Sequence, residues 1–207
     1  LLIEMATART FEIKVLNTPT IKIGGQDLSV GNHFDDKEEI SWSSDNQAMK
    51  VLSDDNKVFV LSKMLFSKVK GKSLYDYLTT TKTASVRNDG ENFPITLADH
   101  RVIFENEFVL LDSLTFNVGW RTNDTSYFEA KTTNLGENNF SFILPANDNE
   151  LTISRELMPQ SVSESGKLAF TISYIEKEYG ETTLITDAMV IEIVPLDSSI
   201  AEEQSIE

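Results

Sequence analysis

Cysteine is absent from the 207 residues, and histidine occurs only twice. A chain without cysteine has no disulfide, no thiolate nucleophile and no zinc site built on thiolates. Serine-hydrolase chemistry would need His33 or His100 as its base, and the sequence has no Gly-x-Ser-x-Gly nucleophile motif. Two isolated histidines also make a poor transition-metal site. We therefore interpret both histidines as structural, and we predict no catalytic residue, metal or other cofactor.

Long apolar runs are also absent. No stretch approaches the roughly 18 apolar residues that a membrane-spanning helix needs, so we predict no membrane span. Residues 1–8 are interpreted as a leader, because "LLI" precedes "ATA", in which Ala6 and Ala8 form a small-x-small pattern typical of secretory cleavage sites. This pattern favours an extracytoplasmic location, in the periplasm or at the cell surface. The alternative is a disordered leader with no targeting role.

Positive charge is scarce in the second part of the chain. Residues 1–87 carry 12 Lys and Arg against 11 Asp and Glu, whereas residues 88–207 carry 6 against 22. The formal net charge of −15 therefore comes almost entirely from the second part. Such a surface repels phosphates, so we predict no nucleic-acid partner. The simplest role of this acidity is solubility.

Apolar residues recur at every second position, which is typical of half-buried strands. Phe11, Ile13 and Val15 alternate with polar residues, and later short runs are separated by the turn sequences "GGQ", "GN" and "SDDN". We predict a mainly all-β fold of two β-rich domains, the first spanning residues 9–104 as a small barrel or sandwich. Residues 97–104 are ambiguous between a strand and a helical turn, because "TLAD" at 96–99 also fits a capping box.

The second domain is predicted for residues 105–197, where the strands lengthen. Its clearest element is "TISYIEKEYGETTLITDAMVIEIV", residues 171–194, in which two alternating runs flank a charged turn with one glycine and so indicate a β-hairpin. The spacing of strands and turns favours an immunoglobulin-like β-sandwich, although the Cys…Trp…Cys signature is absent. The polar, acidic residues 198–207 are predicted to form a disordered tail.

A short helical insert at about residues 62–80 interrupts the strand pattern. Ser62 and Ser73 are suitable N-cap residues, and Gly71 separates two short helices. Lysines crowd this insert, and the binding candidates among them are Lys63, Lys68, Lys70 and Lys72. They are suited to docking an acidic partner, an anionic glycan, or the acidic second domain of the same or another molecule, and the alternative is a solvated helix face.

Other motifs in the sequence carry little chemical information. The Gly-Lys-Ser at 71–73 is not a phosphate-binding loop, because Phe66 stands where that loop needs a glycine. Acidic runs such as "FDDKEE" at 34–39 lack the EF-hand spacing and are interpreted as turns, although loops of a sandwich can combine their acids to bind calcium. With 33 acidic residues, the sequence singles out no pair of carboxylates for glycoside hydrolysis.

Three hypotheses about function follow. The first is an exported, non-catalytic binding or assembly protein that acts through loops or exposed strand edges on a protein or glycan partner. Tyr179, beside the predicted turn, is the aromatic residue expected to be exposed for such binding, whereas Trp42 is expected in the core. The second is a carboxylate-dependent hydrolase with its site between the domains. The third is a regulatory scaffold whose lysine-rich insert recognises an acidic partner. The oligomeric state stays open.

Overall fold

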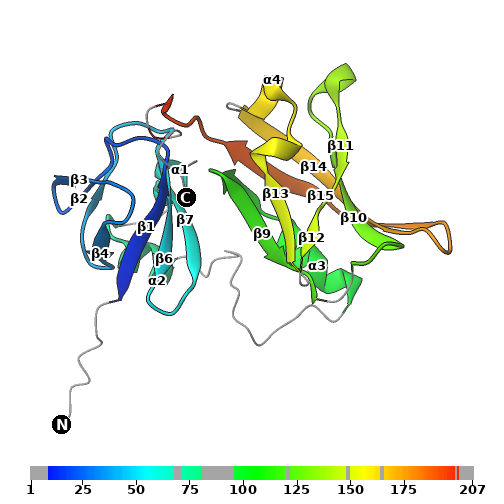
Figure 1. The fold of residues 1–207 in the computed structure, drawn as a ribbon, viewed down its shortest axis with the longest axis horizontal. Coiled ribbons are helices and arrows are strands. Elements are labelled where there is room, and N and C mark those ends of the chain that lie inside the picture. The colour runs from blue at the N-terminus through cyan, green and yellow to red at the C-terminus, as the bar shows by residue number, and fades with distance from the viewer. Residues whose placement is uncertain are drawn as a thin grey trace, which may run out of the picture. The chain divides into compact units, whose positions relative to one another are not determined.

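The computed structural model describes residues 9–67, 71–80, 96–119, 122–147, 150–163, 166–198 and 200 (Figure 1). The chain forms two compact units. The N-terminal unit combines Leu1–Thr83 with Pro195–Glu207, and the C-terminal unit is Ala84–Val194, so the second unit is an insertion in the first. The predicted leader, residues 1–8, lies outside the described residues. None of the helices in the described ranges is long and apolar enough to cross a membrane.

The N-terminal unit contains two small open sheets. One has the strand order β4-β1-β6-β7 and the other β3-β2-β5, and neighbouring strands in both are antiparallel. The strands are β1 Thr10–Leu16, β2 Lys22–Ile23, β3 Gln26–Asp27, β4 His33–Asp35, β5 Ile40–Ser41, β6 Ala48–Ser53 and β7 Val58–Ser62. Between the described strands no barrel closes, so the sandwich is the correct one of the two predicted architectures.

Turn chemistry and a bulge explain how the first strands are placed. The predicted "GGQ" turn is the two-residue connection between β2 and β3, and its residues Gly24 and Gly25 have φ angles of +56° and +83° that favour glycine. In β1 the register against β6 shifts between Ile13 and Val15. This bulge moves Leu16 into the core and leaves Val15 half-buried, contrary to the simple alternation.

One apolar core holds the N-terminal unit together. Its buried residues are Phe11, Ile13, Leu16, Ile21, Ile23, Leu28, Phe34, Ile40, Met49, Val51, Leu61, Phe66, Leu74, Tyr77 and Ile200. Ile200 comes from the segment predicted as a disordered tail, and its 7% exposure shows that this part of the segment is packed. Residues 199 and 201–207 lie outside the described residues.

The buried side chain of Asn17 fixes the returning C-terminal segment to the end of β1. Its amide nitrogen donates to the carbonyl of Pro195 at 2.9 Å, and its Oδ1 accepts from the backbone N–H of Ala48 at 2.8 Å. The backbone N–H of Asp197 in turn donates to the carbonyl of Asn17 at 2.8 Å. These bonds bring the segment to the core that Ile200 enters.

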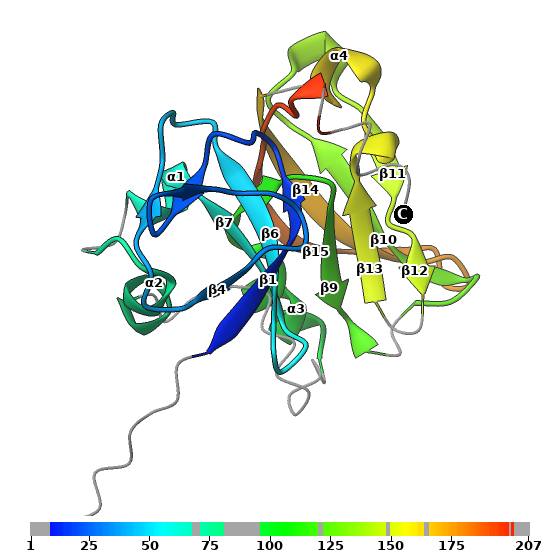
Figure 2. The ribbon, with the colours of Figure 1, turned by 60° about the vertical axis from the view of Figure 1, so that its left-hand side comes forward.

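The C-terminal unit contains a five-stranded sheet, β11-β10-β14-β15-β8, and a three-stranded sheet, β12-β13-β9 (Figures 1 and 2). The strands are β8 Glu107–Leu110, β9 Ser113–Asn117, β10 Ser126–Thr132, β11 Ser141–Ile143, β12 Ala146–Asn147, β13 Glu150–Ser154, β14 Gly166–Glu176 and β15 Glu181–Ile193. Buried residues of both sheets form a single cluster, so the core lies between the two sheets. Short helical segments at Gly136–Asn138, Arg155–Leu157 and Gln160–Ser163, the last labelled α4, complete the unit.

The predicted hairpin is formed by the two longest strands, β14 and β15. Gly180, with a φ of +65°, donates its N–H to the carbonyl of Lys177 at 3.3 Å and closes the turn. Ile172 and Tyr174 on β14 and Ile191 on β15 are buried, as the alternation predicted. Strand β15 also pairs in parallel with β8, in which Val190 pairs with Glu107, a residue 83 positions earlier in the sequence.

Residues 97–104 form helix α3, Leu97–Phe104. The backbone N–H of Thr96 donates to the Asp99 carboxylate at 2.7 Å, which is the capping-box contact at the start of a helix. Phe104 is fully buried in the core of the C-terminal unit, with its ring 5.2 Å from that of Phe116. The helix therefore belongs to the second unit.

The fold class is as predicted, a mainly β-structure with sandwich-like packing and a short helical insert. The narrower immunoglobulin-like assignment of the second unit stays a prediction.

Candidate functional site

The helical insert consists of α1, Lys63–Phe66, and α2, Leu74–Thr80. Ser62 caps α1, since its hydroxyl accepts from the N–H of Leu65 at 3.2 Å. Ser73 precedes α2, where its hydroxyl accepts from the N–H of Asp76 and the Asp76 carboxylate accepts from the N–H of Ser73, both at 3.2 Å. Both predicted caps are therefore present. The hydrogen bond from the Ser73 hydroxyl is the main reason that the pKa of Asp76 is lowered.

Backbone contacts hold the start of α2 against the sheet of β5. The N–H of Ile40 donates to the carbonyl of Lys72 at 2.7 Å, and Glu39 forms an isolated β-bridge with Ser73. The N–H of Tyr75 donates to the carbonyl of Asp36 at 2.7 Å. Lys72 is thereby fixed beside Glu39 and β5, although the two segments are about 30 residues apart in the sequence.

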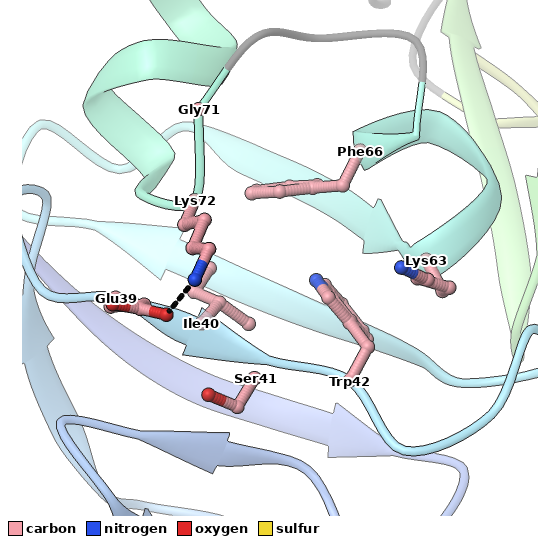
Figure 3. Close-up of a pocket in the computed structure, with 8 residues that line it drawn as sticks. All are labelled: Glu39, Ile40, Ser41, Trp42, Lys63, Phe66, Gly71 and Lys72. Atoms are coloured by element: carbon pink, nitrogen blue, oxygen red, sulfur yellow. Dashed lines mark hydrogen bonds and ion pairs between the residues drawn. The ribbon is translucent and has the colours of Figure 1, made fainter.

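A pocket of about 260 Å³ lies between the insert and β5 (Figure 3). It is lined by Glu39, Ile40, Ser41, Trp42, Lys63, Phe66, Gly71 and Lys72. Two of the predicted binding residues, Lys63 and Lys72, thus share one cavity. All of the lining residues belong to the N-terminal unit.

Aromatic rings form the apolar wall of this pocket. The ring centroids of Trp42 and Phe66 are 5.4 Å apart, and Phe66 stacks on Tyr77 at 4.8 Å with nearly parallel planes. Phe66 and Tyr77 are core residues, and burial raises the pKa of the Tyr77 hydroxyl. Trp42 is half-buried and packs against this core, as expected, but it also lines the pocket, which its sequence context did not indicate.

The indole N–H of Trp42 is the least satisfied polar group of the site. Nε1 is buried and has no hydrogen-bond partner among the described residues. Figure 3 shows this nitrogen turned toward the side where Lys63, Phe66 and Lys72 lie. A buried donor without an acceptor costs about 1–3 kcal/mol, so an acceptor that reaches this N–H after the neighbouring side chains shift would recover this free energy.

The two lysines of the pocket differ in their pairing. Lys72 donates from Nζ to Glu39 Oε1 at 2.9 Å (Figure 3). This hydrogen bond, and next the negative charge of Glu39, raise the pKa of Lys72, so its ammonium form is favoured. Lys63 forms no ion pair with any residue that the structure describes. Counting only the described residues, the pocket therefore has one ammonium group in an ion pair, that of Lys72, and one outside any ion pair, that of Lys63.

The other three predicted binding residues are not among the described residues that line the pocket. Lys68 and Lys70 lie outside the described residues. Tyr179 is 70% exposed at the β14–β15 turn, as expected, but it belongs to the C-terminal unit and is not a lining residue. The structure thus unites two of the five candidates, and it adds Trp42 and Glu39, which the sequence analysis did not single out for binding.

The histidines and the acidic runs have structural positions. His100 is fully buried, and its ring nitrogens lie 2.9 Å from the carbonyl oxygen of Thr96 and 3.2 Å from that of Val118. His33 is exposed on β4. In the run at 34–39, Asp35 accepts from the N–H of Lys37 at 2.8 Å, which is a turn contact. Within the part of the chain that is described, no three His, Asp or Glu side chains are grouped to hold a metal ion.

Asp36 is a buried carboxyl group. It is 6% exposed, and its Oδ1 has no hydrogen-bond partner among the residues described. Burial raises the pKa of Asp36, with smaller contributions from a hydrogen bond to Asp35 and from the charge of Asp35. Asp36 does not line the pocket, so its carboxyl group is not available to a ligand there.

Strand edges were the other predicted binding feature. The outer edge of β15 from Glu181 to Met189 pairs with no described strand, and Leu184 on it is exposed. The register against β14 shifts twice along this stretch, between Phe170 and Ile172 and again before Ser173. Such bulges hinder the addition of a further strand, so this edge supports binding less well than the pocket does.

No protein family, curated protein or solved structure matches this chain, and the site is therefore interpreted from its own residues.

Proposed function

We propose that this chain is a non-catalytic binding protein whose pocket at the helical insert captures an acidic side chain of a partner protein. The observation that carries the proposal is the buried N–H of Trp42, which has no partner among the described residues and belongs to a pocket that two lysines also line. A carboxylate is the natural complement, because it accepts several hydrogen bonds and pairs with ammonium groups. The proposal combines the binding-protein hypothesis with the hypothesis of a lysine-rich insert that recognises an acidic partner.

A protein carboxylate fits the pocket better than a sugar ring does. Sugars bind through the open faces of aromatic rings, and here the face of Phe66 is covered by Tyr77 while Trp42 packs against Phe66. The pocket instead presents an N–H group and charges, and its volume of about 260 Å³ suits one side chain. This arrangement favours an acidic side chain over a glycan.

The protonation state of the site favours binding over catalysis. A general base must lose its proton near neutral pH, whereas the pKa of Lys72 is raised by Glu39. The raised pKa keeps Lys72 positively charged, which suits the capture of an anion. The carboxyl group with a raised pKa, Asp36, does not line the pocket.

Fluorescence anisotropy with a fluorescein-labelled peptide of alternating Gly and Glu tests the proposal. The Lys63→Gln and Lys72→Gln double variant should weaken binding about tenfold or more, because two charge-assisted contacts are lost. Trp42→Phe, which removes the N–H and keeps an aromatic ring, should weaken it roughly fivefold. The control Lys131→Gln, on the exposed face of β10, should bind like the unaltered protein.

Two results would contradict the proposal. One is equal affinity for the Gly-Glu peptide and for the same peptide with Gln in place of Glu. The other is binding of polygalacturonate with no binding of either peptide, which would make the partner a glycan.

An extracytoplasmic site of action is a further part of the proposal. It is supported by the small-x-small pattern at Ala6 and Ala8. Fractionation of the native cells, followed by immunoblotting, tests it, and recovery of the protein in the cytosolic fraction alone would contradict it.

A further inference from the structure

The turn between β14 and β15 joins the two longest strands of the C-terminal unit and carries exposed acids beside an exposed aromatic ring. Figure 1 shows the tip of this hairpin, in orange, reaching beyond β10. Glu178 and Glu181 are exposed, and Tyr179 between them is 70% exposed. Tyrosine is among the residues that contribute most to the free energy of protein–protein binding. The tip therefore combines two carboxylates with a side chain suited to an interface.

The two carboxylates of this turn have no ion-pair partner among the described residues. The cation of the turn, Lys177, instead holds its Nζ 4.9 Å from the centroid of the Tyr127 ring on the neighbouring strand β10. The N–H of Lys177 also donates to the carbonyl of Thr125 at 2.9 Å, which fixes the base of the turn. Glu178 and Glu181 are thus presented on a held turn, with their charges not neutralised by that lysine.

The pocket at the insert has the complementary charge. Lys63 and Lys72 line it, and Glu39, which also lines it, is paired with Lys72 at 2.9 Å. The chain as a whole shows the same division, since residues 88–207 carry 6 Lys and Arg against 22 Asp and Glu, whereas residues 1–87 carry 12 against 11. Surfaces of opposite charge speed their encounter and select the partner. The lysines of the insert therefore suit the acidic turn of another copy of the same chain.

We infer that the pocket binds the β14–β15 turn of a second copy of this chain, so that the protein associates with itself. The inference rests on the proposed function and names its partner. One of the two carboxylates, that of Glu178 or Glu181, enters the pocket of about 260 Å³, and Tyr179 packs at the rim.

The contact joins two different surfaces, because the pocket belongs to the N-terminal unit and the turn to the C-terminal unit. After one such contact has formed, a pair of copies still has one free pocket and one free turn. A contact of this kind therefore builds rings, of which a closed pair is the smallest, or open chains.

Sedimentation velocity of the full chain, from about 5 to 500 µM, tests the inference, because one small contact gives a weak association. The unaltered protein should form species larger than a monomer, and their share should rise with protein concentration. A pocket variant, Lys63→Gln with Lys72→Gln, should weaken this association about tenfold or more. A turn variant, Glu178→Gln with Glu181→Gln, should weaken it to a similar extent. Tyr179→Ser should weaken it about tenfold.

A mixture of the pocket variant and the turn variant gives the sharpest test. The pocket variant keeps its turn and the turn variant keeps its pocket, so one functional contact can form between them. The mixture should form 1:1 dimers and nothing larger, whereas each variant alone should stay monomeric over the same range. An excess of the Gly-Glu peptide should dissociate these dimers, because the peptide occupies the same pocket.

The control replaces two exposed acids elsewhere on the C-terminal unit. Glu137→Gln with Glu156→Gln removes the same charge as the turn variant, and it should associate like the unaltered protein. The side chains of Glu178, Tyr179 and Glu181 are exposed, so the melting temperatures of the turn variants should be unchanged. Unchanged melting temperatures separate the loss of a contact from the loss of the fold.

The possible results separate the two proposals. If the Gly-Glu peptide binds but the unaltered chain stays monomeric over the whole range, the proposed function holds and a second copy is not the partner. If the unaltered chain associates but the mixture does not, the contact does not join the pocket to the turn, and the inference is wrong. An equal loss of association in the control and in the turn variant would also overturn it. If the peptide does not bind the unaltered protein, the proposed function is wrong, and the inference fails with it.

Discussion

The side-chain amide of Asn17 donates a hydrogen bond to the carbonyl of Pro195, 178 positions later in the chain, at 2.9 Å. Asn17 directly follows the first strand of the N-terminal unit, and Pro195 is the first residue after the inserted C-terminal unit. The same amide also donates to the carbonyl of Asn46. One buried side chain thus joins three segments of the N-terminal unit.

Asn17→Ala should destabilise the N-terminal unit by about 2–4 kcal/mol, because it leaves buried backbone groups without partners. Urea denaturation followed by tryptophan fluorescence measures this change. Asn17→Asp keeps an oxygen for the N–H of Ala48 but loses both donated bonds, so it should also destabilise. The control Thr18→Ala, at the neighbouring half-buried position, should change stability little, and an equal loss in the Asn17→Ala and Thr18→Ala variants would contradict the role assigned to Asn17.

Ile191→Asp should destabilise the C-terminal unit by on the order of 4 kcal/mol, because Ile191 is fully buried and an unpaired charge in an apolar core is costly. The matched control is Ala188→Asp, which adds the same charge at an exposed position of β15. Thermal unfolding should show a much lower midpoint for Ile191→Asp only. Equal midpoints for the two variants would mean that the faces of β15 are assigned wrongly.

Asp36→Asn should make the protein more stable at neutral pH. Burial raises the pKa of Asp36 in the folded state above its unfolded value of about 3.9, so the folded state binds the proton more tightly. The free energy of unfolding is therefore highest below the unfolded pKa, where Asp36 is protonated in both states, and it falls as the pH rises through the folded pKa. Asn cannot ionise, so the free energy of unfolding of Asp36→Asn lacks this fall.

Urea denaturation at several pH values from 3 to 7 measures this difference for Asp36→Asn and for the control Asp27→Asn. Asp27 is 70% exposed, so its variant should follow the unaltered protein. A difference between Asp36→Asn and the unaltered protein that is constant across the pH range would contradict a raised pKa.

Gly71→Ala should disturb the insert and weaken peptide binding. Gly71 has a φ of +154°, and an added Cβ would lie 2.3 Å from the Cβ of Asp76, so the backbone at the pocket must shift. The expected cost is about 1–3 kcal/mol. In Gly25→Ala, φ is +83° but the Cβ meets nothing within 4 Å, so this control reports backbone strain alone. If both variants bind the Gly-Glu peptide normally, the contact with Asp76 does not position the pocket.

The strands and caps could be predicted because they depend on neighbours in the sequence. The alternation around Ile172 and Ile191 gave the buried faces of the hairpin, and Ser62 and Ser73 begin helices as their side chains allow. The burial of Leu16 in place of Val15 could not be predicted, because a bulge is set by pairing with a strand over 30 residues away.

The sequence predicted only some of the residues that line the pocket as binding residues. The lysines of the insert form a recognisable cluster in the sequence. Trp42 lies in an ordinary strand pattern, which predicts a core residue. That pattern does not indicate that the segment of β5 lies next to the insert. Glu39 stood in an acidic run that is interpreted as a turn, and its pairing with Lys72 depends on contacts between segments about 30 residues apart. Long-range pairing therefore decides which polar residues meet.

The return of the chain to the N-terminal unit has a consequence for synthesis on the ribosome. The core that contains Phe11 also includes Ile200, so this unit is incomplete until residue 200 has been translated and has left the exit tunnel. The inserted unit consists of residues 84–194, which are all translated before residue 200. It can therefore fold while the N-terminal unit is still incomplete. The unit whose synthesis starts second can thus complete its fold first.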